Sequence, residues 1–513
     1  MNQVINTILI NLALFTPLVA LLFSKSNRRW EIAYASRLAG LISAATIWAC
    51  VVFNVDIIHP FPLIHFTGVS STVLLLVHLI GFVVLNYARR NFELDADDQR
   101  FLQWFLITLF SVMVTVVSNH LLVLWLGWVS ISVSLHQLLM FYPQRYRAVL
   151  AAHKKFIFAR AAEVLLGIAF LLIYVEHGNA YIDQIFAQYP LPNLSVNLHI
   201  AAFLIANVVL IKCAQLPLHG WLIQVVESPT PVSALLHAGI INLGGLLLLL
   251  FAPLFSQSLP AQALVAIVAS VSAIIAAMVM MTITSVKVRL AWSTIAQMGL
   301  MLVECALGLY TLALLHLLAH SIYKAYAFLS AGEAVNQHVL QQQLQVASTK
   351  LDWATALAVT LTSLIAAIYY EWISAPYSPW VLLAGTAIVL LAKRSIPTTP
   401  LTAVVPILML IALYVALKTG IANLLPNVQH IYYWQSDLLV SVLFIGLFVA
   451  YIALFEIEHK ALRSRLLPLL NAGFYLDEWS TRVTLRIWPI SLPKKQAKFN
   501  IKQELNNEII NQA

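Results

Sequence analysis

Titratable side chains stand inside some of the most apolar stretches of the chain. Lys212 lies in HIAAFLIANVVLIKCAQLP, and His237 lies in TPVSALLHAGIINLGG. A charged group at the centre of a bilayer costs about 2.5–3.5 kcal/mol even on lenient scales, so such groups usually face a protein interior and serve an ion path. Lysine and histidine in these places can bind and release protons. The two residues therefore predict proton transfer within a membrane.

A third stretch, HLLAHSIYKAYAFL, carries titratable groups at regular spacing. His316, His320 and Lys324 recur every four residues, so on a helix they share one face. Such a stack predicts a polar wire through an otherwise apolar helix. The simpler alternative is that each histidine makes one hydrogen bond between helices, as most membrane histidines do.

Acidic residues in apolar runs are candidate partners for these bases. Arg160 and Glu163 are three residues apart and can pair on one helix, either for ion transfer or simply to fix helix packing. Glu304 lies deep in its run, where we expect it to partner a lysine.

Prolines near Lys212 predict a broken helix. Pro217 follows the lysine closely, and Pro229 and Pro231 flank Thr230. Proline removes a helical hydrogen bond and frees carbonyl groups that can bind water or ions. A second site of this kind is predicted where the run 354–372, with Glu371, meets Pro376 and Pro379, as expected of inverted repeats.

The composition shows which elements must position these groups. Of 513 residues, 61% are hydrophobic and 10% charged, whereas soluble domains carry about 25% charged residues. We predict an all-α, polytopic bundle of about 15 transmembrane helices. The apolar runs are 4–23, 33–54, 70–87, 101–118, 119–141, 156–175, 199–216, 232–252, 260–283, 290–308, 311–331, 354–372, 379–392, 400–417 and 437–455.

Basic residues predict the orientation of the bundle, because short loops rich in Lys and Arg stay in the cytoplasm. They follow the first, fifth, ninth and thirteenth runs: Lys25, Arg28, Arg29; Arg145, Arg147, Lys154, Lys155; Lys287, Arg289; Lys393, Arg394. The N-terminus is therefore expected outside. The net charge of +8 is explained by this pattern and by anionic lipid, without a nucleic-acid partner.

The chain divides by composition into two parts. Residues 1–455 are predicted to form one transmembrane domain, and 456–513 a cytoplasmic C-terminal tail. The stretch NAGFYLDEWSTRVTLRIWP in the tail fits an interfacial or partner-docking helix, and residues 494–513 fit a solvated, partly disordered end.

The sequence shows no sign of chemistry carried by a bound group. The cysteines, Cys50, Cys213 and Cys305, lie in apolar segments without the spacing of a zinc site. No stretch resembles a nucleotide, flavin, quinone or iron–sulfur site. We expect no metal or cofactor in this chain, and an ion-translocating subunit instead of an independent enzyme.

Several motifs resemble a known family. KCAQLPLHGWL, ESPTPVSALLHA, VKVRLAWSTIAQMG and HLLAHSIYKAYAFL are similar to the antiporter-like subunits of respiratory complex I and of multisubunit cation/proton antiporters. The resemblance covers roughly residues 100–330. It implies inverted five-helix repeats with broken helices, and Lys212 as the family's broken-helix lysine. It also implies His237 as the bridging histidine, and it places His316, His320 and Lys324 on the connecting wire.

One position departs from the family. Its fifth helix carries a glutamate, in a context like LGWEG, that pairs with the broken-helix lysine. Here LGWVS places Val129 there. The candidates for the missing counter-group are His136, Glu163 or a partner subunit.

Two further stretches point to one branch. LLHAGIINLGG and NAGFYLDEWSTRVT are similar to the membrane subunits of the Dab inorganic carbon accumulation systems. The resemblance implies location in a bacterial inner membrane and a large cytoplasmic DabA-type partner that contains zinc. Protons or Na⁺ crossing the membrane subunit would then drive CO2 hydration in that partner.

Two alternatives stay open. One is a proton-translocating subunit of an NADH:quinone oxidoreductase or a cation/proton antiporter. The other, which Val129 keeps open, is a membrane anchor that conducts nothing.

Overall fold

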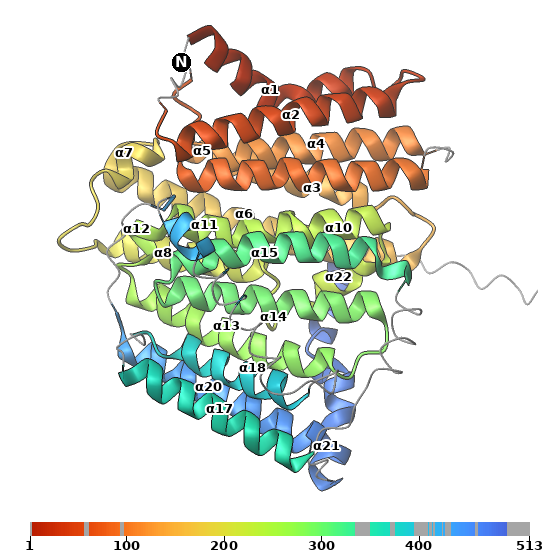
Figure 1. The fold of residues 1–513 in the computed structure, drawn as a ribbon. Helices are drawn as coiled ribbons and strands as arrows, with labels where there is room; N and C mark the ends of the chain where they lie inside the picture. The colour runs from red at the N-terminus through yellow and green to blue at the C-terminus, as the bar shows by residue number, and fades with distance from the viewer. Residues whose placement is uncertain are drawn as a thin grey trace, which may run out of the picture.

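The protein is built from helices that lie side by side (Figure 1). The computed structural model describes residues 3–55, 61–92, 97–333, 349–369, 375–393, 409, 413, 416–422, 424–425, 432–456 and 460–489. Within these ranges the only β pairing is two isolated bridges, Ile64 with Ser118 and His120 with Tyr181. The predicted all-α class is confirmed.

The helices follow the apolar runs in chain order. The N-terminal part contains α1 (Gln3–Leu22), α2 (Arg29–Val52), α3 (Gly68–Phe92), α4 (Asp98–Val117), α5 (Leu121–Leu139), α6 (Tyr146–His177) and α7 (Ile182–Phe186). The central part contains α8 (Val196–Lys212), α9 (Gly220–Gln224), α10 (Thr230–Ala238), α11 (Leu243–Leu250), α12 (Ala252–Phe255), α13 (Leu259–Met280), α14 (Val286–Ala306) and α15 (Tyr310–Leu329). The C-terminal part contains α17 (Lys350–Tyr369), α18 (Ser378–Ala392), α20 (Trp434–Tyr451), α21 (Lys460–Asn471) and α22 (Glu478–Ile487).

Most of these helices are long and apolar enough to cross a bilayer. Ten candidate spans occur among the described residues, with α8, α18 and Leu351–Ile365 of α17 as shorter apolar helices. Helix α14 adds a further helix of similar length between α13 and α15. The predicted run 400–417 falls largely outside the described residues. The arrangement agrees with about 15 crossings.

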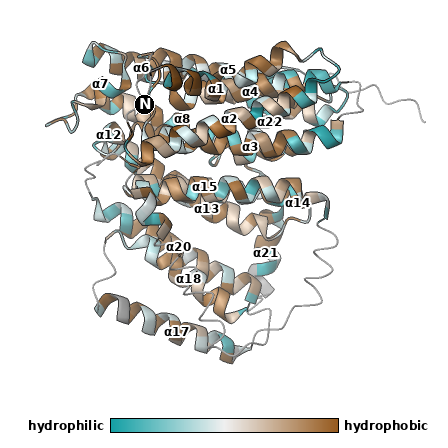
Figure 2. Ribbon diagram, turned by 45° about the horizontal axis from the view of Figure 1, so that its top comes forward, coloured by the Kyte–Doolittle hydropathy of each residue, from teal (hydrophilic) through white to brown (hydrophobic). Residues whose placement is uncertain are grey.

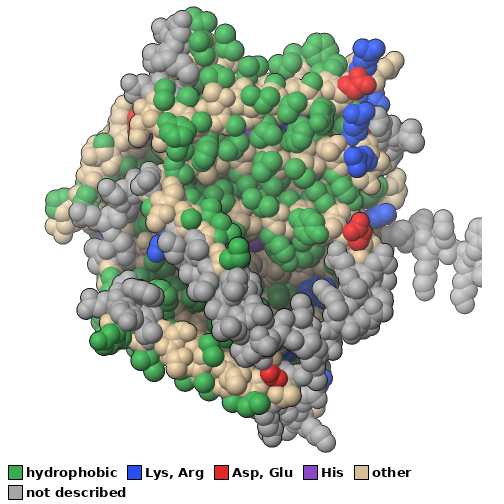
Figure 3. Space-filling model, in the orientation of Figure 1, with side chains coloured by type: hydrophobic (Ala, Val, Ile, Leu, Met, Phe, Trp, Pro, Cys, Tyr) green, Lys and Arg blue, Asp and Glu red, His purple; other side chains and the backbone are tan. Residues whose placement is uncertain are grey.

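The long helices are mainly hydrophobic. Apolar residues cover the length of the long helices, and hydrophilic residues concentrate at their ends (Figure 2). On the face shown in Figure 3, the Lys and Arg side chains gather mainly at one edge, beside a broad hydrophobic band. The band is the expected lipid-facing surface, and the predicted orientation depends on the basic edge.

Contacts between helices place the broken-helix region at the centre of the molecule. Helix α8 packs against α6, α11 and α13, while α10 packs against α3 and α15. Helix α14 lies against both α13 and α15. The helices that carry the residues predicted to transfer protons, α6, α8, α10, α14 and α15, are therefore neighbours in the bundle.

Two details differ from the predicted runs. Helix α8 ends at Lys212, five residues before Pro217, whereas the predicted run extends to 216. Helix α6 begins at Tyr146 and has 32 residues, because the basic residues before 156 continue the helix instead of forming a loop. Glu371, at the end of the predicted second break, lies outside the described residues.

The orientation can be tested with two exposed loop positions, Asn27 and Gln188. With Cys50 replaced by serine, a membrane-impermeant maleimide should label Gln188→Cys in intact cells. Asn27→Cys should react only after the cells are permeabilised, because the loop beside Arg28 and Arg29 is expected in the cytoplasm. The reverse labelling pattern would mean that the basic edge faces outward.

Candidate functional site

The break after α8 is held by side chains that bond to its free backbone groups. The chain leaves the helix at Cys213, and Ala214 adopts a left-handed conformation with φ of 52°. Gln215 Nε2 donates to the Cys213 carbonyl at 2.8 Å, and Trp221 Nε1 donates to the Ile211 carbonyl at 3.3 Å. Helix ends leave carbonyls without partners, so these bonds allow the break to lie buried.

The prolines have different roles from those predicted. Pro217 lies in the gap between α8 and α9, as expected. Pro229 is the residue that caps α10, and Pro231 lies in its first turn. Proline is favoured in the first turn of a helix because its missing N–H would be unpaired there anyway. Pro229 and Pro231 therefore start a helix and do not break one.

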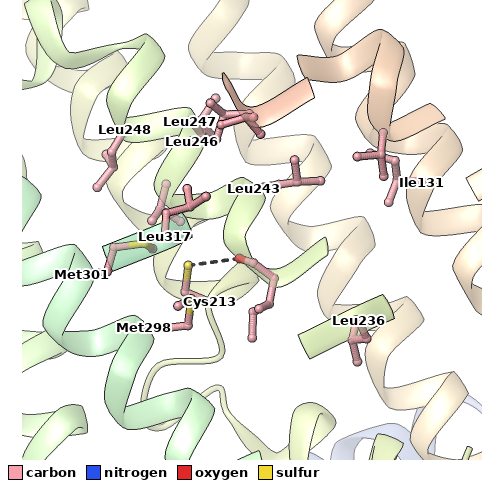
Figure 4. Packing of buried hydrophobic residues seen from close by; sticks show 14 of the residues in the cluster. Ile131, Cys213, Leu236, Leu243, Leu246, Leu247, Leu248, Met298, Met301 and Leu317 are labelled. Carbon is pink, nitrogen blue, oxygen red and sulfur yellow. Dashed lines mark hydrogen bonds between the residues drawn. The ribbon is translucent and has the colours of Figure 1, made fainter. Parts of the chain in front are cut away.

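Cys213 anchors the break in the apolar core. Its side chain points among Leu243, Met298 and Met301 (Figure 4), and its Sγ contacts the Ile241 carbonyl at 3.6 Å. A Cβ added to Gly244 would collide with this sulfur. The residue that follows α8 is therefore packed closely against α11.

Lys212 meets its counter-group on α6. Its Nζ lies 3.7 Å from Glu163 Oε1 and donates to Ser132 Oγ at 3.2 Å. Ser132 Oγ in turn hydrogen-bonds Glu163 Oε1, and the centroid of the Trp128 ring lies 5.3 Å from the ammonium. Lys212 is the last residue of α8, where the helix dipole also favours a cation.

Two more cations surround the same carboxylate. Arg160 Nη2 lies 2.7 Å from Glu163 Oε2, the pairing that their spacing predicts. Lys155 is buried, and its Nζ donates to the Ser132 carbonyl at 3.0 Å. Like charges repel strongly where water is scarce. The loss or gain of one proton would therefore change the forces on all of these groups.

Glu163, one of the three candidates for the missing counter-group, is the residue that pairs with Lys212. Val129 lies on α5 one turn before Ser132, so it points toward the same region. His136, the other candidate, lies one turn beyond Ser132 with its Nδ1 3.3 Å from the Ala152 carbonyl. Among the described residues, Glu163 and not His136 forms the ion pair with Lys212.

The predicted wire on α15 faces α14. His316 Nδ1 lies 3.0 Å from Glu304 Oε1, and its Nε2 lies 3.0 Å from Gln297 Oε1. The expectation that Glu304 partners a lysine is wrong, because the register of α14 and α15 places His316 beside it. The ring centroids of His316 and His320 are 6.4 Å apart.

Lys324, the last residue of the series on α15, lies on the part of that helix that packs against α10. Buried Lys324 donates to the Leu290 carbonyl at 3.0 Å and to Ser293 Oγ at 2.9 Å. His237 Nδ1 lies 3.1 Å from Thr294 Oγ1 on the same face of α14. Neither ring nitrogen of buried His320 has a hydrogen-bond partner among the described residues. Buried polar atoms nearly always find a partner, often water.

The two groups are separate in this structure. No hydrogen bond or ion pair among the described residues joins the Lys212 group to the group formed by His237, His316, His320 and Lys324. The segment between them holds Gln215, whose Nε2 reaches the Ile295 carbonyl of α14 at 3.4 Å. Buried His219 follows in the same segment.

Sequence reasoning missed three residues of these groups. Ser132 and Gln215 carry no charge, so nothing in their type singled them out. Lys155 lies just before the predicted apolar run 156–175 and so counts as a loop residue there, although one more turn of helix places it inside the helix. No three His, Cys, Asp or Glu side chains converge as a metal site among the residues that the structure describes.

Comparisons with known proteins agree with this architecture. Residues 118–370 match the family described as NADH:quinone oxidoreductase/Mrp antiporter, TM. The Mrp complex from Dietzia sp. contains a chain similar in fold, with a TM-score of 0.59 and 18% identity, covering 100% of this chain and 62% of the other.

Two curated relatives are closer in sequence. The probable inorganic carbon transporter subunit DabB of Hydrogenovibrio crunogenus is 44% identical over 96% of this chain and 98% of its own length. The probable inorganic carbon transporter subunit DabB2 of Halothiobacillus neapolitanus is 36% identical over 83% of this chain and 82% of its own. This multi-pass membrane chain, with its antiporter-like fold, therefore belongs to the DabB family of probable inorganic carbon transporter subunits.

Proposed function

We propose that the chain is the membrane subunit of an energy-coupled inorganic carbon accumulation complex. It conducts protons, or Na⁺, and the free energy of that movement drives CO2 hydration to bicarbonate in a large cytoplasmic DabA-type partner that contains zinc. The observation that carries the ion-conducting part is the buried ion pair of Lys212 and Glu163 at the end of a broken helix. The carbon chemistry rests on the relatives named above.

The ion pair supplies a site with two charge states. With Lys212 protonated, its ammonium is attracted to Glu163 and bonded to Ser132. When it loses the proton, Arg160 still holds the carboxylate at 2.7 Å, and Lys212 is free to move with the end of α8. A buried pair is expensive to break. The loss of the proton from Lys212, which breaks the pair, can therefore do mechanical work on the helix.

The wire offers a route to this site. His316, His320 and Lys324 succeed one another along α15, starting six residues from its first residue, Tyr310. Under the proposed orientation that end faces outward. A proton would pass along this series to His237 and cross the Gln215 segment to Lys212. It would leave on the cytoplasmic side past Lys155, which lies between Glu163 and the start of α6 at Tyr146.

The alternative is a proton-translocating subunit of an NADH:quinone oxidoreductase or a cation/proton antiporter. The match of residues 118–370 supports the shared ion path in that case as well. The two functions differ in what the subunit assembles with.

Purification of the tagged chain from its native membrane tests the assignment. We expect one large partner to accompany it, with zinc in stoichiometric amount by elemental analysis. A set of dehydrogenase or antiporter subunits in the purified material would contradict the carbon function and leave the ion path standing.

The position of the carboxylate can be exchanged between two helices. Glu163→Gln should lower inorganic carbon accumulation by about tenfold or more, because it leaves buried cations without an anion. Adding Val129→Glu, at the place of the family glutamate, should restore a measurable part of the activity. Glu176→Gln is the matched control, since Glu176 lies exposed on the same helix with Asn197 as its hydrogen-bond partner. Full activity of the Glu163→Gln variant would favour the non-conducting anchor.

A further inference from the structure

Helix α22 has its faces reversed relative to a surface helix in water. Ser480 and Thr484 are buried against the protein, whereas Trp479, Val483 and Ile487 are 41%, 42% and 61% exposed. These apolar residues recur every four positions and so form one stripe. A stripe of this kind on a helix outside the core normally meets a membrane or another protein.

The stripe continues the lipid-facing side of α6. Trp479 packs edge-on against Phe158, with ring centroids 6.1 Å apart. Phe158 lies at the end of an exposed apolar face of α6 that includes Val164, Ile168 and Val175, each at least 45% exposed. The surface of α22 and the surface of α6 thus form one apolar area.

The length of α6 places this junction at the membrane boundary. Its 32 residues extend about 48 Å at about 1.5 Å per residue, against a hydrocarbon core of about 30 Å. About 20 residues counted back from His177 fill that core, which brings the boundary to Phe158. Tryptophan concentrates at this depth. Exposed Arg482 and Arg486 of α22 are then at the level of the lipid headgroups.

The opposite side of α22 is fixed to the protein by Asp477. Lys154 Nζ, which is fully buried, lies 2.9 Å from both carboxylate oxygens and 2.7 Å from Thr481 Oγ1. Gln224 Nε2, at the end of α9, donates to Asp477 Oδ2 at 2.9 Å. A Cβ on Gly220, the first residue of α9, would collide with the same carboxylate.

Asp477 therefore contacts both ends of α9, the short helix that follows the break at Lys212. Its partner Lys154 is the neighbour of Lys155, which bonds to Ser132 beside Lys212. The carboxylate joins three elements that are far apart in sequence: α6, α9 and the segment that starts α22. A displacement of α9 would have to move this segment or break the Gln224–Asp477 hydrogen bond.

We propose that α22 lies in the headgroup region of the bilayer at the basic edge, with its apolar stripe in lipid, and that Asp477 ties it to α9. The occupant of the stripe is anionic lipid, whose headgroups complement Arg486 and also Arg482, which pairs with Glu478 on the exposed side. The tie makes Asp477 a positioning residue for the broken helix. Its effect on transport rests on the function proposed above, whereas its position and its contacts do not.

A fluorophore attached to single cysteines tests the lipid contact. In the intact complex, reconstituted with phosphatidylglycerol-containing lipid and with Cys50 replaced by serine, Val483→Cys should be quenched by a shallow lipid-borne nitroxide and little by aqueous iodide. Asn27→Cys, in an exposed loop, should show the opposite. Quenching of position 483 by iodide would overturn the proposal. Protection from both quenchers would overturn it too, because it would show that a partner protein covers the stripe.

Amide hydrogen exchange tests the tie without measuring transport. Asp477→Asn should speed exchange in peptides covering 219–227 and 472–488 by about tenfold or more, while α1 to α4 stay unchanged. Glu478→Gln is the control, because its pair with Arg482 is exposed and contributes little. Lys154→Met combined with Asp477→Asn should disturb exchange less than the two single changes summed, since no buried charge is left alone. Additive effects, or unchanged exchange in 219–227, would contradict the tie.

Discussion

The structure depends on one electrostatic requirement: an ammonium group buried at the end of a broken membrane helix must have an anion beside it. Lys212 ends α8 within 3.7 Å of Glu163. An unpaired charge at this depth would oppose insertion and folding. The close packing of α8 against α6 keeps these two groups together, and side-chain bonds from Gln215 and Trp221 satisfy carbonyls at the break.

The same requirement explains how the chain tolerates Val129. A lysine in a helical bundle has neighbours on several helices, and an anion on any of them can neutralise it if the distance is similar. Ser132 on α5 accepts a hydrogen bond from the Lys212 ammonium, and Glu163 on α6 forms an ion pair with it. In this structure the carboxylate beside Lys212 therefore comes from α6, although α5 has Val129 on the same side.

The polar groups are arranged as separate sets and not as one continuous chain. His316 and Glu304 form a pair near one end of α15, while Lys324 bonds to neutral oxygens on α14. Gln215 reaches from the broken segment to α14 and lies between the sets. Among the described residues, no continuous series of hydrogen bonds therefore joins the two sets.

The sequence by itself determined the class of protein, the membrane crossings and the break near Lys212, because hydropathy, basic loops and prolines act through local physics. It also indicated Lys212, His237 and the α15 series as candidates for proton transfer, since a titratable group in an apolar run is visible without any structure. The tertiary structure decided the partners. Glu304 met His316 instead of a lysine, Lys155 entered the Lys212 group, and Asp477 reached α9 from the far end of the chain. These contacts depend on the register and packing of helices distant in sequence, and no local pattern encodes them.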